Sequence, residues 1–212
     1  MSYTRLRTPR AVVPRAFYDR AVLAVAPELL GMLLVRREDD GGETVARIVE
    51  TEAYREDDPA SHSFRGRTDR NAVMFGPPGH LYVYFTYGMH FCMNVSCEPD
   101  GTGAAVLLRA AAVLRGHEHV RARRAVHPDR DLLRGPARLT QGLAVGRGHN
   151  GLDVTDPTSP LRVEDDGWRP DRDTVLTGPR TGIRVAVEQP WRFWLDGVPE
   201  VSRHSRHPRA WR

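Results

Sequence analysis

LYVYFTYGMHFCMN, residues 81–94, is the stretch that decides how this chain folds. From Leu81 to Thr86 apolar and polar side chains alternate, which is the period of a β-strand with one apolar face. Tyr87 and Gly88 break the alternation where a turn would lie, and residues 89–94 can run back as a second strand. We therefore expect a β-hairpin that carries tyrosines on its polar face and another tyrosine at its tip.

These tyrosines allow two interpretations. An interior hairpin would bury their rings and give each hydroxyl a hydrogen-bond partner. A hairpin that meets nucleic acid would use the rings to stack on flat bases, with the Tyr87 side chain as a wedge. The hairpin alone does not separate the two interpretations.

The composition limits the classes of protein that fit. With 212 residues, of which 40% are hydrophobic, the chain is long enough for one domain with a real core, and this composition argues against wholesale disorder. The formal net charge of +4 fits an anionic partner without requiring one. All 31 basic residues are arginine, so no lysine side chain can act as an amine nucleophile anywhere in the chain.

The two cysteines, Cys92 and Cys97, are too few and too close together for a disulfide framework or a zinc site. The His117-Glu118-His119 run lacks further ligands nearby, so we expect neither a metal nor another cofactor. No apolar signal segment and no run of membrane-spanning length occurs. We expect a soluble monomer in the cytoplasm, associated with the nucleoid if the source is bacterial, with no membrane partner.

The order of the predicted elements indicates the fold class. Strands dominate the middle and helices gather after residue 115, which is typical of an α+β fold with a mainly antiparallel sheet. Residues 1–15 are expected to be a flexible basic arm, 16–203 a single domain and 204–212 a basic tail. Besides the hairpin, strands are expected at 32–37, 43–54, 104–109, 161–164, 184–187 and 191–195, and helices at 23–30 (capped by Asp19), 117–126 and 136–145.

Three places carry polar residues that suggest chemistry. Glu50, Glu52 and Tyr54 share one face at the end of an otherwise apolar strand, although an exposed polar edge would look the same. Arg109 closes the apolar run AAVLLR and is expected to meet a carboxylate, in a site or in a plain salt bridge. His62 lies in a long polar loop and could line a pocket or be an ordinary loop histidine.

Several ordered blocks then resemble the alkyladenine (3-methyladenine) DNA glycosylase family. The blocks are IVETEAY (48–54), His62-Ser63, GHLYVYFTYGMHFCMN (79–94), VLLRA (106–110), RGPARLTQGLAV (134–145) and PRTGI (179–183). The similarity extends from Phe17 to Ser202. The loop between Tyr54 and His62 and the basic tail depart from the family pattern.

The resemblance implies a compact α+β domain with a curved sheet, flanking helices and a protruding hairpin that enters the DNA minor groove. It implies an enzyme of DNA repair that flips alkylated or deaminated purines out of double-stranded DNA and hydrolyses the N-glycosidic bond. For the reaction, the resemblance implies that Glu52 is the general base and that Arg109 and the backbone carbonyl of Thr181 hold the attacking water. For the base, it implies that Tyr54, Tyr84 and His62 hold the flipped ring and that Asn94 crowds the amino group of guanine. For the duplex, it implies that Tyr87 fills the gap left by the flipped nucleotide.

The chemistry of the residues fits this reading independently. A carboxylate such as Glu52 can deprotonate water and steady an oxocarbenium-like charge at C1′. Without lysine, the chain offers no side-chain amine for a Schiff base, so we expect a monofunctional glycosylase without lyase activity.

Two alternatives remain open from the sequence. A non-catalytic binder of distorted or damaged DNA could use the same hairpin, but it would have no use for a paired Glu52 and Arg109. A small-molecule glycosidase could use Glu50 and Glu52 as its two carboxylates, but it would not need a tyrosine at the hairpin tip.

Overall fold

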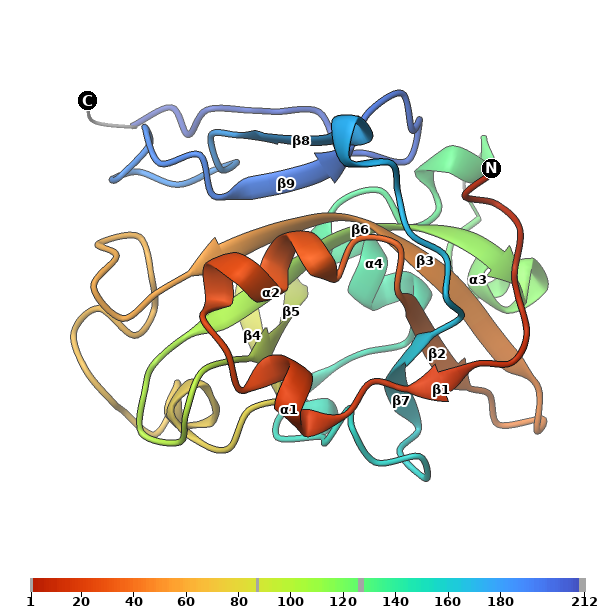
Figure 1. The fold of residues 1–212 in the computed structure, drawn as a ribbon, viewed down its shortest axis with the longest axis horizontal. Helices are drawn as coiled ribbons and strands as arrows, with labels where there is room; N and C mark the ends of the chain where they lie inside the picture. Colours follow the sequence, from red (N-terminus) through yellow and green to blue (C-terminus); the bar gives the residue numbers. More distant parts are fainter. Residues whose placement is uncertain (1, 87, 126–127, 210–212) are drawn as a thin grey trace.

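The longest strand, β3 (Glu43–Tyr54), runs through the middle of the sheet in this computed structural model, which describes residues 2–86, 88–125 and 128–209 (Figure 1). Residues 44–53 are all buried, so both faces of this strand are covered. The other strands of the described residues are β1 (Ala11–Val12), β2 (Leu33–Arg37), β4 (Leu81–Thr86), β5 (His90–Ser96), β6 (Ala105–Arg115), β7 (Leu161–Asp165), β8 (Val175–Gly178) and β9 (Arg192–Leu195).

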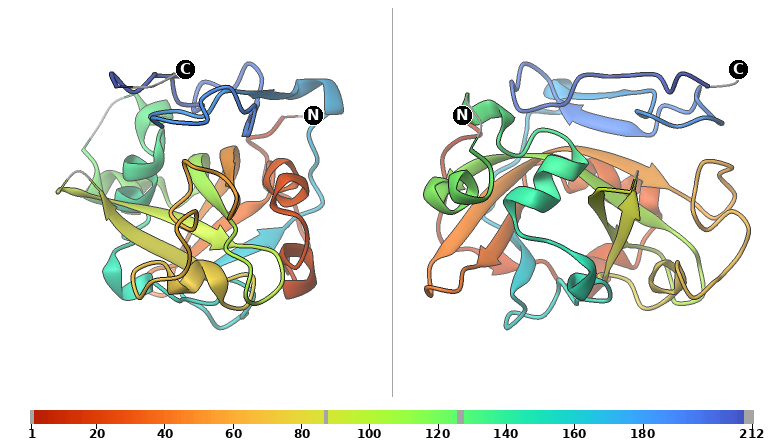
Figure 2. Two further views of the ribbon diagram at one scale, coloured as in Figure 1. Left: turned by 90° about the vertical axis from the view of Figure 1, so that its left-hand side faces the viewer. Right: turned by 180° about the vertical axis from the view of Figure 1, so that it is seen from behind.

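All pairings between these strands are antiparallel, in the order β1-β7-β2-β3-β6-β5-β4. β6 follows one edge of β3, whereas the other edge pairs first with β2 and then with β9, which in turn pairs with β8. Figures 1 and 2 show β8 and β9 above the curled sheet. The second half of β3 therefore lies between β6 and β9, and this position decides which side chains meet there.

Short helices cover the sheet on both sides. α2 lies in front of β3 and β6 and α4 lies behind them (Figures 1 and 2). Apolar side chains of both helices belong to one continuous core with the sheet. The α-helices are α1 (Arg15–Tyr18), α2 (Val22–Glu28), α3 (His117–Arg123) and α4 (Pro136–Gly142), and the 3-10 helices are η1 (Ala72–Phe75), η2 (Asp129–Asp131), η3 (Arg147–His149) and η4 (Arg172–Thr174).

The fold class predicted from the sequence is confirmed: a single compact α+β domain with a curled antiparallel sheet. β4 and β5 pair as the alternation predicted, with Tyr84 opposite Cys92. Tyr87 at the turn lies outside the described residues.

Two local predictions are wrong, and one strand, β8, was not predicted. Residues 184–187 form bends and a turn instead of a strand, and Ala186 takes a left-handed conformation (φ 52°) that a strand does not allow. β8, which has no strong alternation, forms because β9 offers it a partner edge. Asp19 does not cap α2, which begins after Ala21 without a side-chain cap; Asp19 follows the end of α1 instead.

Residues 1–15 are expected from the sequence to be a flexible basic arm, and the described part of this segment, residues 2–15, contacts the sheet at several points. β1 pairs with β7, and the Arg47 guanidinium donates to the backbone carbonyls of Tyr3 (2.7 Å) and Arg5 (2.8 Å). These contacts are to backbone atoms, so the residue types of the segment gave no signal of them.

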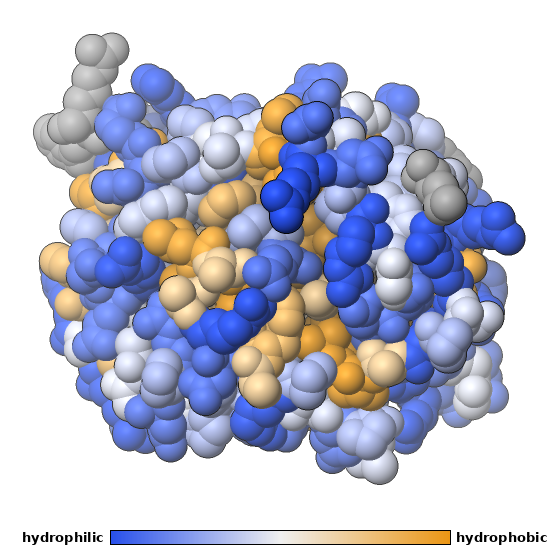
Figure 3. All heavy atoms as spheres, viewed as in Figure 1, coloured by the Kyte–Doolittle hydropathy of each residue, from blue (hydrophilic) through white to orange (hydrophobic). Residues whose placement is uncertain are grey.

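The surface seen in Figure 3 is mostly polar, with apolar atoms gathered in a band across the middle of that face. The large hydrophobic side chains that stay exposed among the described residues are Phe64, Phe85 and Met89. Phe85 and Met89 flank the turn of the hairpin, so an apolar pair stands beside the tip tyrosine in sequence.

Candidate active site

Glu52 is fully buried in the second half of β3, where three hydrogen-bond donors face its carboxylate. The Tyr54 hydroxyl donates to Oε2 (2.8 Å), and the backbone N–H of Thr181 donates to Oε1 (2.7 Å). The guanidinium of Arg109 lies 3.2 Å from the same Oε1. A carboxylate has about four acceptor positions. One position, on Oε2, is therefore left without a donor among the described residues.

A second buried carboxylate, Glu50, lies two residues earlier on the same strand. It accepts from Nε of Arg109 (2.7 Å), from Nε of Arg192 (2.7 Å) and from the backbone N–H of Ser202 (2.8 Å). Burial raises the pKa of Glu50, but the neighbouring guanidinium groups outweigh burial and hold that pKa below its ordinary value. The prediction that Arg109 meets a carboxylate is confirmed, and it meets two.

The backbone explains why Arg109 reaches both carboxylates. The register between β3 and β6 passes from Ile48–Ala111 to Glu50–Ala110 and then to Thr51–Leu108, so it skips Arg109. Such a bulge re-aims a side chain that regular pairing would direct elsewhere. Burial lowers the pKa of Arg109, but Glu52 and Glu50 together raise it above the ordinary value, so this guanidinium stays charged.

A cavity of about 530 Å³ opens in front of these groups. Its volume is in the range of small-molecule binding sites. Glu52 lies directly behind its wall, because its three donors all belong to the lining. Of the residues singled out from the sequence, Tyr54, His62, Tyr84, Asn94, Arg109 and Thr181 line the cavity, together with Tyr82, Cys92, Leu107, Arg65, Arg184 and others.

Aromatic rings make up one wall of the cavity. Tyr84 stacks on Tyr82 with ring centroids 5.5 Å apart, and His62 meets Tyr84 edge-to-face at 4.6 Å. The Tyr82 hydroxyl lies 3.0 Å from Nδ1 of His62. Burial and the nearby Arg70 lower the pKa of His62, so this ring is neutral at pH 7. The wall is therefore aromatic and uncharged, with Tyr82 and Tyr84 stacked and His62 edge-on to both.

Asn94 belongs to the floor of the cavity. It lies on β5, opposite Tyr82 on one side and Leu107 on the other. Its amide nitrogen donates to the Tyr82 carbonyl (3.2 Å), and only 5% of the residue is exposed. This hydrogen bond fixes the orientation of the Asn94 amide in the cavity lining.

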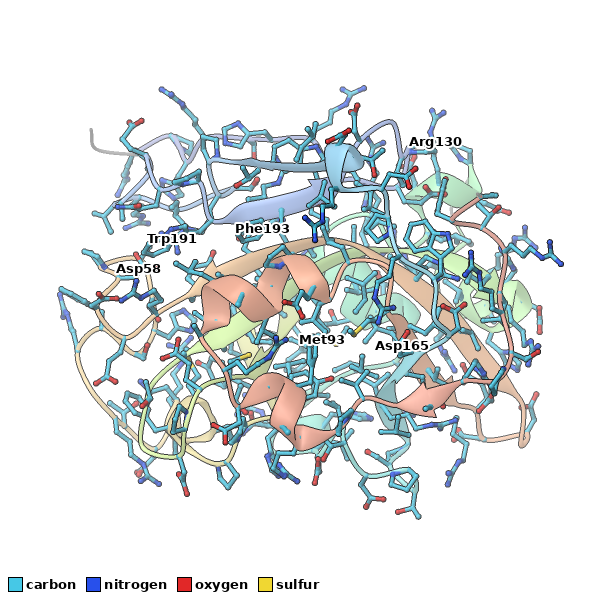
Figure 4. All side chains as sticks on the ribbon, in the orientation of Figure 1. Asp58, Met93, Arg130, Asp165, Trp191 and Phe193 are labelled. Atoms are coloured by element: carbon cyan, nitrogen blue, oxygen red, sulfur yellow. The ribbon has the colours of Figure 1, made fainter. Side chains whose placement is uncertain are left out.

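Sequence reasoning missed the support behind Tyr54. The Arg180 guanidinium lies 4.6 Å from the centroid of the Tyr54 ring and 5.1 Å from that of Trp191. It donates to both oxygens of Asp58, one of them at 3.0 Å, and both partners are fully buried. Figure 4 shows Asp58 and Trp191 at the same end of the molecule. Arg180 and Asp58 are brought together by the fold. The only sequence signal for Arg180 was its position beside Thr181 in the PRTGI block.

Tyr82 was also missed as a pocket residue, although the alternation of the hairpin pointed to it. It shares a face with Tyr84 and is 1% exposed. Tyr87, predicted as the wedge, falls outside the described residues, so its side chain is not placed.

Within the described ranges, no group of three or more histidine, cysteine, aspartate or glutamate side chains is arranged to hold a metal ion. Among the same residues, none of the helices has the length and apolar character needed to cross a membrane.

Comparison with known proteins adds a family match. Residues 16–199 match the family model described as methylpurine-DNA glycosylase. A Burkholderia lata protein is 52% identical over 198 residues, covering 92% of this chain and 93% of its own length. Proteins of Streptomyces avermitilis (48% over 204 residues, 95% and 94% covered) and Nocardia farcinica (46% over 195 residues, 89% and 92% covered) are similar. All three carry the name "Putative 3-methyladenine DNA glycosylase".

Proposed function

Since this chain belongs to the methylpurine-DNA glycosylase family, we propose that it is a DNA-repair enzyme that releases damaged purines from double-stranded DNA. The target nucleotide is flipped out of the duplex, its base enters the cavity, and water cleaves the N-glycosidic bond. The product is an intact strand with an abasic site.

The observation that carries this proposal is the open acceptor position on the buried carboxylate of Glu52. A general base needs a free lone pair within reach of the proton that it takes. The three donors around Glu52 leave such a position on Oε2. The same carboxylate would steady the positive charge that develops at C1′ as the bond breaks.

Arg109 and the loop at Thr181 hold this carboxylate in place. Arg109 is fixed by both glutamates, and the Thr181 N–H donates to Oε1 of Glu52. We propose that the Arg109 guanidinium and the Thr181 carbonyl also hold the attacking water. A reactant held within about 3–3.5 Å of its target reacts far faster than one that must diffuse into place.

The aromatic wall suits a flipped base. Extrusion of a base from the duplex costs a few kcal/mol, and stacking on an aromatic ring returns about 1–3 kcal/mol per base. In the proposed arrangement, the base lies between Tyr54 and the pair formed by Tyr84 and His62. Asn94 would crowd the exocyclic amino group of guanine, and Tyr87 would fill the gap in the duplex.

The type of damaged base decides whether the enzyme must supply a proton to the leaving group. An alkylated purine is cationic and leaves without further protonation, whereas a neutral base such as hypoxanthine or ethenoadenine needs a proton as it leaves. Water is the proposed nucleophile for both, because the chain has no lysine and arginine stays protonated at working pH. The enzyme is therefore proposed to be monofunctional.

The experiment incubates the protein with duplexes that each carry one defined lesion and then analyses the strands with and without alkali. We expect breaks at the lesion only after alkali, and no protein–DNA adduct with borohydride. Binding without base release would support a non-catalytic binder instead. An adduct that survives blocking of the terminal amine would contradict water as the nucleophile.

A further inference from the structure

The buried Glu50 and Arg192 and the half-buried Ser202 form a cluster around Arg109 that the proposed reaction does not use. We propose that these three are positioning residues: they fix the Arg109 guanidinium and keep the charge beside Glu52 balanced, and so they set the pH range in which Glu52 can act. The inference rests on the proposed function, because it concerns the same site.

The first argument is the orientation of Arg109. Its Nε donates to Glu50 (2.7 Å), one terminal nitrogen donates to Oγ of Ser202 (3.2 Å), and the other faces Glu52 (3.2 Å). A planar guanidinium held on three sides cannot rotate without breaking a hydrogen bond. Glu50 and Ser202 therefore determine which nitrogen of Arg109 points at Glu52.

The second argument is charge. Glu50 and Glu52 carry two negative charges and Arg109 and Arg192 carry two positive ones, all in side chains no more than 6% exposed. Arg192 lies opposite Glu52 in the register of β3 and β9, and its Nε donates to Glu50 (2.7 Å). Removing one charge from a balanced buried cluster leaves a net charge that water screens poorly. Glu52 would then experience that net charge.

The third argument is the set of contacts that Ser202 makes from the C-terminal segment. Both the N–H and the Oγ of Ser202 donate to Glu50 (2.8 Å each). Its carbonyl accepts from Arg192 (2.7 Å). Three residues on, the carbonyl of Ser205 accepts from the N–H of Gly182, next to the Thr181 that holds Glu52 (3.0 Å). The C-terminal segment therefore links the supports of both carboxylates.

The other groups near Glu52 do not obscure this effect. Burial raises the pKa of Tyr54, Tyr84 and Cys92 above their ordinary values, so these stay neutral in acid. His62, whose pKa is lowered, is common to all variants below. The titratable and charged groups around Glu52 and its partners come from three places. The strands contribute Glu50, Tyr54, Tyr84, Cys92, Arg109 and Arg192. The cavity lining contributes His62, Arg65 and Arg184, and Arg180 lies behind Tyr54.

The test measures single-turnover release of 7-methylguanine from duplex DNA as a function of pH. This cationic base leaves without protonation, so the acid limb of the profile reports protonation of the enzyme's base. Glu50→Gln removes a negative charge and favours ionised Glu52, so the acid limb of the rate–pH profile of this variant should move about one pH unit lower. Arg192→Gln removes a positive charge and should move the limb about one pH unit higher.

Two further variants complete the design. The double variant Glu50→Gln/Arg192→Gln is balanced again, and its acid limb should return to the wild-type position. Ser202→Ala changes no charge, so it should keep the wild-type limb while the plateau rate falls, by less than about tenfold. Loss of Arg109 orientation in Glu50→Gln should lower the plateau rate about 10- to 100-fold.

The matched control is Glu38→Gln, the same substitution at a buried carboxylate that pairs with Arg123 and Thr44 and contacts no cavity residue. It should leave the acid limb unchanged. If Glu50→Gln and Arg192→Gln share the wild-type limb or move it in the same direction, the cluster is only structural and the inference is wrong. If the charged variants do not fold, an unchanged plateau rate in Ser202→Ala overturns it. Failure of the wild-type protein to release any base would instead overturn the proposed function.

Discussion

Strand β3 carries two buried charge clusters, and they differ in whether every acceptor position of the carboxylate is filled. Near its start, Arg47 donates all five of its N–H groups, to Asp166 and to the carbonyls of Tyr3, Arg5 and Gly31. Near its end, Glu52 keeps one acceptor position open behind the cavity wall. Both clusters are fully buried and paired. What distinguishes the candidate site is therefore the unfilled position.

The largest expected effect would test that distinction directly. Glu52→Gln keeps the size and hydrogen-bonding shape of the side chain but removes its ability to accept a proton. Single-turnover release of hypoxanthine or 7-methylguanine should slow about 100- to 10,000-fold, while lesion binding, measured by gel shift, should persist. Activity equal to wild type would show that the open position on Glu52 has no part in the chemistry.

The complementary change is made in the Arg47–Asp166 cluster, where every hydrogen-bonding position is filled. Asp166→Asn leaves the Arg47 charge buried and uncompensated, which should lower the free energy of unfolding by about 3–5 kcal/mol. Urea unfolding would measure this loss. Base release per folded molecule should be unchanged, since among the described residues none of the hydrogen-bond partners of Asp166 lines the cavity in front of Glu52. A slowed reaction in the folded variant would break the proposed separation of the clusters.

The same pair predicts a pH dependence. Burial raises the pKa of Asp166, but hydrogen bonds from Arg47 and from backbone N–H groups outweigh burial and lower it below its ordinary value. A group with a lowered folded-state pKa stabilises the protein above its unfolded pKa and loses that contribution as the pH falls through the folded one. Stability should therefore fall in acid more steeply in the wild type than in Asp166→Asn.

A third pair lies between these extremes. Arg180 is paired with buried Asp58, as in a structural cluster, but its guanidinium supports the Tyr54 ring from behind. Asp58→Asn weakens this pairing while the amide still accepts a hydrogen bond. As with Asp166→Asn, the guanidinium is left buried without its counter-charge, so we expect the free energy of unfolding to fall by about 3–5 kcal/mol and base release to slow by up to about tenfold because Tyr54 is less firmly held. Urea unfolding and single-turnover kinetics on one preparation separate the two effects, and an unchanged rate would place the pair with the purely structural cluster.

The sequence predicted the parts of the site that depend on local period. Strand alternation placed Glu50, Glu52 and Tyr54 together and paired the hairpin strands correctly, because these relations span only a few residues. Arg109 could be expected to find a carboxylate because an arginine in an apolar run must be paired. The long polar loop drew attention to His62 without deciding whether it lines a pocket, and the family resemblance added Thr181, which local patterns alone did not identify.

The remaining supports depend on long-range topology. Arg180 and Asp58 are 122 residues apart in sequence, and Ser202 and Glu50 are 152 apart. Neither local propensity nor hydrophobic period carries information over such separations. The bulge that aims Arg109 at both carboxylates is likewise a property of strand pairing. These supports become visible only once β9 and the C-terminal segment lie beside β3.

The smallest expected effect concerns Thr181, and it asks which atoms of the loop matter. The backbone N–H of Thr181 donates to Glu52, whereas its hydroxyl oxygen is buried and makes no hydrogen bond within the described part of the chain. Thr181→Val keeps the shape and the backbone N–H and removes a buried polar group without a partner, which is close to neutral for stability. Base release should stay within about twofold of wild type if only the backbone acts. A loss of tenfold or more in single-turnover release would mean that the hydroxyl helps hold the attacking water. The candidate site would then have two unpaired polar groups, the acceptor position on Glu52 and the Thr181 hydroxyl. Both would distinguish it from the fully hydrogen-bonded Arg47 cluster.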